Sequence, residues 1–198
     1  MIHLKKNREK VQNQCKKIAL LGTKNGVGVT HIGILLAEFL SETMGARVAF
    51  LEINYYGHIE KIERELWGYS KDVFSYAGVD FYKEIETVKI ENLQECYQYL
   101  ILDFGIQKKK DEQEIQKCDE KVIIGTLNLW EWQEYMQAVT HFRKLWAKEN
   151  ISYVVTFGNE KLIHRMKKVL KEKVWFLGYQ PMETVLSAKI ESFFNTLI

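Results

Sequence analysis

Along this chain, short apolar runs alternate with longer segments in which apolar residues recur at helical spacing. The short runs are rich in β-branched and aromatic residues, and they predict strands at 18–22, 47–53, 99–104, 121–126, 151–157 and 174–179. Strands that are apolar along their whole length and alternate with helices are typical of a parallel sheet covered on both faces. The pattern therefore predicts an α/β fold, a doubly wound and mostly parallel sheet flanked by helices.

The helical spacing predicts four helices, and it fades in one part of the chain. The helices are expected at 32–40, 136–146, 161–171 and 185–197. The stretch 67–97 is less regular, and there we expect an edge strand near 79–83 and a short helix near 91–97. The apolar stripe of the last helix, Ile190, Phe193, Phe194 and Leu197, could pack into the core or lie on a membrane. We expect core packing because its polar face is poor in basic residues.

Composition narrows the class of protein. The 198 residues are 46% apolar and 27% charged, with one proline and no linker-like stretch, which predicts a basic leader at 1–15 and a single domain at 16–198. The three cysteines are isolated, so neither a disulfide framework nor a zinc site is indicated. The apolar run at 18–22 is too short for a membrane span or signal segment, and we expect a cytoplasmic protein with no integral membrane segment.

A glycine-containing loop follows the first predicted strand and leads directly into a helix. Its sequence is TKNGVGVTH at 23–31. Glycines let the backbone approach a ligand closely, and the unpaired N–H groups at a helix N-terminus attract anions. Taken alone, such a turn is more often a tight connection than a ligand site, so the loop by itself leaves both interpretations open.

The segment 24–30 resembles the deviant Walker A loop, KGGVGKT, of the MinD/ParA P-loop ATPases. The resemblance implies that Lys24 is the signature lysine that reaches the partner subunit's nucleotide in a sandwich dimer. It also implies that Gly26, Val27 and Gly28 form the phosphate cradle and that Thr30 ligates Mg²⁺. Two positions depart from the family's pattern: Asn25 replaces a glycine, and Val29 replaces the lysine that binds the β- and γ-phosphates.

The resemblance continues to the end of the chain, with irregular correspondence between about 60 and 97. The second strand of the family usually ends in Asp-x-Asp, and here these positions are Glu52 and Asn54. The family's second aspartate orients the attacking water, and an amide cannot accept a proton from it. YLILDFG at 99–105 resembles the Walker B strand, which implies that Asp103 holds a magnesium-bound water. By the same resemblance, Asn159 contacts the adenine and Pro181 belongs to the base-binding loop.

Together these residues predict a site for ATP or ADP with Mg²⁺. Its nucleotide-binding residues are Lys24, Asn25, Gly26, Val27, Gly28, Val29, Thr30, His31, Asn159 and Pro181, and its metal ligands are Thr30 and Asp103. His31 follows Thr30 in the first helical turn, where it either donates to a phosphate or is solvated. A charge-assisted hydrogen bond contributes about 1.5–3 kcal/mol, so the loss of the lysine at Val29 should weaken triphosphate binding by roughly one to two orders of magnitude. Hydrolysis should suffer more, because it depends on stabilising charge in the transition state.

We therefore expect a pseudo-ATPase with no assigned catalytic residue. DFG at 103–105, in place of the family's commoner proline-containing switch, and the altered Walker residues favour the TadZ/CpaE-like branch. That resemblance implies a homodimer that acts as a localisation or scaffold factor for a pilus or secretion assembly and reaches the membrane through a partner. A slow Mg²⁺-dependent ATPase that dimerises through Lys24 is one alternative.

A ParA-like factor that binds DNA nonspecifically is another alternative. The predicted helix near 161–171 and its flank are basic: Lys161, Arg165, Lys167, Lys168, Lys171 and Lys173. A lysine-rich helix face binds phosphates or is simply solvated, and the net charge of +2 decides neither. Trp130 and Trp132 follow the fourth predicted strand, and they indicate a partner surface if exposed and core if buried.

Overall fold

The computed structural model describes residues 15–69, 71–83, 90–146, 150–182 and 184–198. Of the predicted basic leader, residues 1–14 lie outside this range. Within it, eight strands form one sheet in the order β3-β4-β2-β5-β1-β6-β7-β8. The strands are β1 Lys16–Gly22, β2 Val48–Glu52, β3 Val73–Tyr76, β4 Val79–Tyr82, β5 Tyr99–Ile106, β6 Glu120–Leu127, β7 Ile151–Gly158 and β8 Val174–Phe176. All neighbours pair in parallel except β3 and β4, which confirms the predicted α/β fold class.

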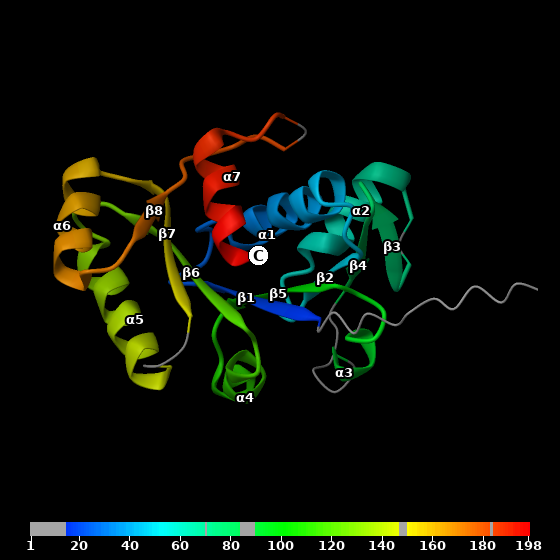
Figure 1. Cartoon of the computed structure of the whole chain (residues 1–198), viewed down its shortest axis with the longest axis horizontal. Helices are drawn as coiled ribbons and strands as arrows, with labels where there is room; N and C mark the ends of the chain where they lie inside the picture. Colours follow the sequence, from blue (N-terminus) through cyan, green and yellow to red (C-terminus); the bar gives the residue numbers. More distant parts are fainter. Residues whose placement is uncertain (1–14, 70, 84–89, 147–149, 183) are drawn as a thin grey trace, which may run out of the picture.

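Helices cover both faces of this sheet (Figure 1). The α-helices are α1 Val29–Glu38, α2 His58–Trp67, α3 Ile90–Leu93, α4 Glu112–Gln116, α5 Trp132–Leu145, α6 Glu160–Leu170 and α7 Ala188–Phe194. A π-helical turn at Phe39–Thr43 extends α1, and short 3-10 turns lie at Lys109–Asp111 and Asn195–Leu197. The core on one face includes residues of α1, α2 and α7, and the core on the other includes residues of α3, α4, α5 and α6.

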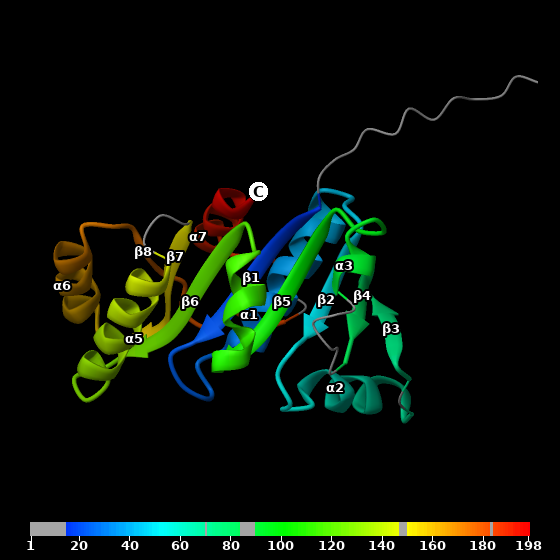
Figure 2. The same cartoon turned by 90° about the horizontal axis from the view of Figure 1, so that it is seen from below.

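The two cores follow from the alternation of side chains along each strand. In β1, Ile18 and Leu20 belong to the α1 side, whereas Ala19 and Leu21 belong to the α5 side. The carboxyl ends of the seven parallel strands meet at one edge, where the β1–α1 loop and the start of α2 lie (Figure 2). In a doubly wound sheet this is the edge at which ligands bind.

The six predicted strands and four predicted helices are confirmed within a few residues, and the short helix expected near 91–97 is α3 at Ile90–Leu93. The expected edge strand near 79–83 is β4, but it is not an edge strand. It pairs in parallel with β2 and antiparallel with β3, which forms the edge. The pattern of apolar residues did not predict β3, α2 or α4.

The apolar stripe of the last predicted helix, which is α7 and the 3-10 turn after it, packs into the core as expected. Ile190, Phe193, Phe194 and Leu197 are all buried, and Phe39 of the α1 extension lies against Phe194. None of the helices in the described ranges combines the length and apolarity needed to cross a bilayer.

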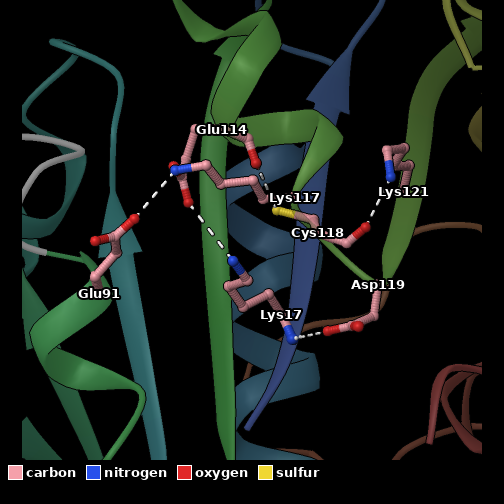
Figure 3. A network of polar contacts seen from close by, with 7 residues as sticks. All are labelled: Lys17, Glu91, Glu114, Lys117, Cys118, Asp119 and Lys121. Carbon is pink, nitrogen blue, oxygen red and sulfur yellow. Dashed lines mark hydrogen bonds and ion pairs between the residues drawn. The ribbon is translucent and has the colours of Figure 1, made fainter.

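A polar network joins α4 to β1 and β6 at the opposite edge of the sheet. Its members are Lys17, Glu91, Glu114, Lys117, Cys118, Asp119 and Lys121 (Figure 3). The backbone N–H of Lys17 donates to Asp119 at 2.7 Å, and the buried Lys121 ammonium donates to the carbonyl of Cys118 at 2.7 Å. Burial raises the pKa of the Cys118 thiol to about 12, so this thiol stays protonated. The network holds the α4–β6 connection in place and lies far from the glycine-containing loop.

The close approach of α1 to the sheet at Gly33 gives a test of this packing. A Cβ on Gly33 would lie 2.6 Å from Cδ1 of Leu20 and 2.7 Å from Cε2 of Phe50, both fully buried. Helix propensity alone would make Gly33→Ala stabilising by about 1 kcal/mol. We expect instead a net loss of about 1–3 kcal/mol in the free energy of unfolding, measured by urea denaturation, because α1 must move away from the sheet. A variant as stable as the original chain would contradict the packing described here.

Candidate functional site

The loop between β1 and α1 has the backbone of an anion cradle. Gly26 and Gly28 have φ of 76° and 94°, in the left-handed region that favours glycine, and Gly28 is the N-cap of α1. The hydroxyl of Thr156, on β7, donates to the carbonyl of Val27 at 2.8 Å and fixes the middle of the loop. The N–H groups of the first helical turn have no partner within the helix and so can bind an anion.

A cavity of about 380 Å³ lies over this loop. Its lining residues are Lys24, Asn25, Gly26, Val27, Gly28, Val29, Thr30, His31, Tyr56, His58, Asp103, Gly105 and Ile106. It thus brings together all the predicted residues from 24 to 31 with the predicted metal ligand of β5. A larger hollow of about 730 Å³ near the amino ends of β6 and β7 is lined by residues such as Glu120 and Arg143, and it has no glycine loop or helix N-terminus facing it. We therefore take the smaller cavity as the candidate site.

Thr30 and Asp103 meet directly in this cavity. The Thr30 hydroxyl donates to Oδ2 of Asp103 at 2.6 Å, and Nδ1 of His58 lies 3.1 Å from the same hydroxyl. The Asp103 side chain is fully buried, and this burial raises its pKa against the opposing hydrogen bonds from Thr30 and the Gly105 N–H. A hydroxyl and a carboxylate are hard oxygen donors of the kind that Mg²⁺ prefers, so the pair fits the predicted metal. The described residues include no group of three or more His, Cys, Asp or Glu suited to a metal, so water or a phosphate would have to supply the other ligands.

Val29 stands at the position where the MinD/ParA loop has its phosphate-binding lysine. Its side chain is 8% exposed and belongs to the apolar core on the α1 side, close enough to Gly22 that a Cβ there would lie 2.9 Å from it. Among the described residues that line the cavity, Lys24 is the one lysine or arginine.

The ammonium of Lys24 is paired with Glu131, a residue that the sequence analysis missed. Oε1 of Glu131 accepts from Lys24 and, at 2.9 Å, from the Thr126 hydroxyl. Oε2 accepts from the backbone and side-chain N–H groups of Asn128, each at 2.9 Å. Burial alone would raise the pKa of Glu131, but the hydrogen bonds from Lys24, Thr126 and Asn128 outweigh it and lower the pKa. The carboxylate is therefore ionised over the physiological range.

Glu52 and Asn54, which stand at the positions of the family's Asp-x-Asp, hold the turn that follows β2. The Asn54 amide donates to the Asp103 carbonyl at 3.1 Å and accepts from the Tyr56 N–H at 3.0 Å, so both ends of the amide are used. Glu52 is buried and accepts from the backbone N–H of His58 at 2.8 Å. Neither side chain lines the cavity. His58 does line the cavity, and it is the first residue of α2, a helix that the sequence analysis did not predict.

Of the three remaining predicted nucleotide-binding residues, His31 lines the cavity, whereas Asn159 and Pro181 do not. Nε2 of His31 lies 2.5 Å from the Gln180 carbonyl, and its ring stacks on Tyr179 at 5.5 Å, so it joins the phosphate loop to the segment after β8. Asn159 caps α6 by accepting from the Lys161 N–H at 3.0 Å. Asn159 and Pro181 are not among the lining residues of the cavity. Their predicted contacts with a base therefore stay predictions.

The two tryptophans after β6 have opposite environments. Trp130 is 79% exposed, next to Leu129, which is 77% exposed. Trp132 is partly buried, and the guanidinium of Arg165 lies 4.6 Å from its ring centre. Exposed apolar side chains at the ligand-bearing edge of a sheet favour a partner surface over core packing for Trp130.

The lowered pKa of Glu131 predicts how stability depends on pH. A carboxyl group whose pKa is lower in the folded than in the unfolded chain stabilises the fold above its ordinary pKa, and this contribution disappears as pH falls through the folded value. Glu131→Gln should therefore lower the free energy of unfolding by on the order of 1 kcal/mol at pH 7, and the difference should shrink below about pH 4. Denaturation curves from pH 3 to 7 measure this. Glu134→Gln, an exposed neighbour in α5, is the matched control and should show no such trend.

Comparison with known proteins supports the same assignment of the fold. No protein-family model and no curated protein sequence matches the chain. Solved structures do match. A plasmid partition protein from Borrelia burgdorferi B31 bound to AMPPNP has a TM-score of 0.61 at 16% identity, over 93% of this chain and 96% of its own. A ParA family ATPase from Chlorobium tepidum has a TM-score of 0.57 at 16% identity, over 89% of both chains.

A third match is a chain of the MinC:MinD cell division complex from Aquifex aeolicus. Its TM-score is 0.61 at 15% identity, over 92% of this chain and 86% of its own. Identities this low establish the architecture and nothing finer. The chain has the fold of the ParA and MinD P-loop ATPases.

Proposed function

We propose that this chain is a degenerate member of the MinD/ParA type that binds Mg-ATP or Mg-ADP weakly, hydrolyses ATP slowly or not at all, and acts as a localisation or scaffold factor. One observation carries the proposal. The cavity keeps the glycine cradle and the Thr30–Asp103 oxygen pair, whereas Val29, at the position of the phosphate-binding lysine, is packed into the core.

The preserved parts of the cavity support nucleotide binding. The backbone N–H groups of the cradle and of the first turn of α1 would bind phosphate oxygens, and Thr30 and Asp103 would hold Mg²⁺ between them and the phosphates. Bound Mg²⁺ would supply positive charge at the phosphates. The similar Borrelia burgdorferi structure is bound to AMPPNP, which is consistent with this use of the fold.

Two features argue against efficient hydrolysis. Phosphoryl transfer needs cations that stabilise charge in the transition state, and the cavity offers Lys24, which pairs with Glu131. It also needs a group that orients water, and both ends of the Asn54 amide are engaged by the backbone. An amide held in this way neither accepts a proton nor turns toward the cavity.

An exposed apolar rim at the ligand-bearing edge supports a protein partner. Leu129 and Trp130 follow β6, Phe157 lies near the carboxyl end of the adjacent β7, and Tyr179 follows β8. Each of these four side chains is more than 60% exposed. A second copy of this chain would cover this rim in a dimer that Lys24 bridges, and a component of a pilus or secretion assembly is the further partner we propose. MinD is found in complex with MinC in one of the similar structures.

Titration of Mg-ATP into the full chain, with phosphate release measured in parallel, tests the proposal. We expect a dissociation constant one to two orders of magnitude weaker than a P-loop with both lysines would give, and little or no phosphate release. Sustained turnover that Lys24→Ala abolishes would replace the scaffold by the alternative, a slow ATPase. Absence of binding at millimolar nucleotide would contradict both.

Restoring the missing charge should strengthen binding. Val29 lines the cavity and lies at the base of the cradle, so the longer side chain of Val29→Lys would bring an ammonium to the phosphates. We expect the affinity for Mg-ATP, measured by calorimetry, to rise by about 10- to 100-fold. Val29→Met is the matched control for side-chain length without charge, and it should leave the affinity unchanged. An equal gain in both variants would show that loop packing, rather than charge, limits binding.

The exposed basic residues of α6 are the basis of the alternative that the chain binds DNA. Lys161, Lys167 and Lys168 are exposed on one side of α6, where they suit either phosphate contacts or solvation. If the chain is a ParA-like partition factor, random duplex DNA should bind it with steep salt dependence, and Lys167→Glu with Lys168→Glu should abolish binding in an electrophoretic shift experiment. Our proposal expects no such binding at physiological salt.

A further inference from the structure

Lys24 and Glu131 belong to loops that are distant in sequence and adjacent in space. Lys24 follows β1, Glu131 follows β6, and these two strands are neighbours in the sheet. The pair therefore ties the phosphate loop to the turn that carries the exposed Trp130.

The carboxylate is held independently of the lysine. Thr126 and the two N–H groups of Asn128 together donate three hydrogen bonds to it, and its side chain is 9% exposed. If Lys24 departs, these three donors remain, so Glu131 stays in place as an acceptor. A preformed acceptor of this kind can release and recapture an ammonium without rearranging its own loop.

Lys24, by contrast, is free to change partner. Its side chain is 35% exposed and lines the cavity over the phosphate loop. A lysine ammonium is a compact charge on a flexible stem, and it pairs with a phosphate as readily as with a carboxylate. The ammonium cannot pair closely with Glu131 and with a phosphate at the same time, so the two anions compete for it.

We propose that Glu131 is a positioning residue that holds Lys24 in the nucleotide-free chain, and that the phosphates of Mg-ATP must displace it to engage this lysine. The inference rests on the proposed nucleotide binding and adds an internal competitor to it. Nucleotide affinity then includes the cost of breaking the Lys24–Glu131 pair. The competitor also keeps Lys24 withdrawn from any second copy of the chain until nucleotide is present.

Calorimetric titration of Mg-ATP into four full-length proteins tests the competition. Relative to the original chain, Glu131→Gln should bind about two- to tenfold more tightly, as expected for the loss of a partly exposed ion pair. Glu134→Gln removes an exposed carboxylate from α5, which begins directly after Glu131, and this variant should bind as the original does. In a Lys24→Ala background, Glu131→Gln should give no gain. A gain that persists there would mean general charge repulsion and would overturn the inference.

A measurement on the unsubstituted chain does not depend on how well Glu131→Gln folds. Lys24 and Thr126 donate to the same carboxylate oxygen, so protons on Cε of ¹³C-labelled Lys24 should show a nuclear Overhauser contact with the Thr126 methyl group. Saturating Mg-ATP should remove it. If Mg-ATP binds and the contact persists, or if Glu131→Gln binds no more tightly, the inference fails while the proposed function stands. If no protein binds Mg-ATP, the proposed function fails and the inference with it.

Discussion

The close contact of α1 with β1 and β2 at Gly33 is the constraint on which the candidate site depends. Since no side chain separates helix from sheet there, α1 starts directly at the carboxyl edge, and the loop before it must turn within a few residues. Gly26 and Gly28 allow that turn, and Thr30 in the first turn of α1 then lies within 2.6 Å of Asp103 on β5. The cradle is thus a consequence of core packing.

The same packing explains how the chain tolerates Val29. A lysine at this position would place a charged side chain at the base of the loop, where it needs a phosphate partner. Valine instead joins the apolar core and stabilises the loop without a ligand. The loop is therefore stabilised at this position by core packing and not by a bound ligand. Such packing is consistent with the proposed function, in which the fold acts through its surfaces more than through hydrolysis.

The sequence predicted the parallel part of the sheet well because its strands are long apolar runs, whereas the hairpin of β3 and β4 is specified by a weaker signal. β3 and β4 form a hairpin whose turn has positive φ at both Ala77 and Gly78, and Ala-Gly is not a strong hairpin sequence. The loop residues from Lys24 to His31 were predictable because they are contiguous. Glu131 was not, since its contact with Lys24 spans 107 residues and exists only because β6 lies beside β1.

Lys24 finally connects the chemistry of the cavity to the surface around it. It has three potential partners in the proposed function: Glu131, a phosphate in its own cavity, and a phosphate held by a second copy. The ammonium pairs closely with only one of these anions at a time. The affinity of Lys24 for one partner therefore depends on whether the others are bound, and this linkage is reciprocal. Glu131 is on the turn that exposes Trp130, so the anion that competes for Lys24 is part of the rim that a partner would cover. In the proposed function, covering this rim and binding nucleotide would therefore be coupled through the single charge of Lys24, with or without hydrolysis.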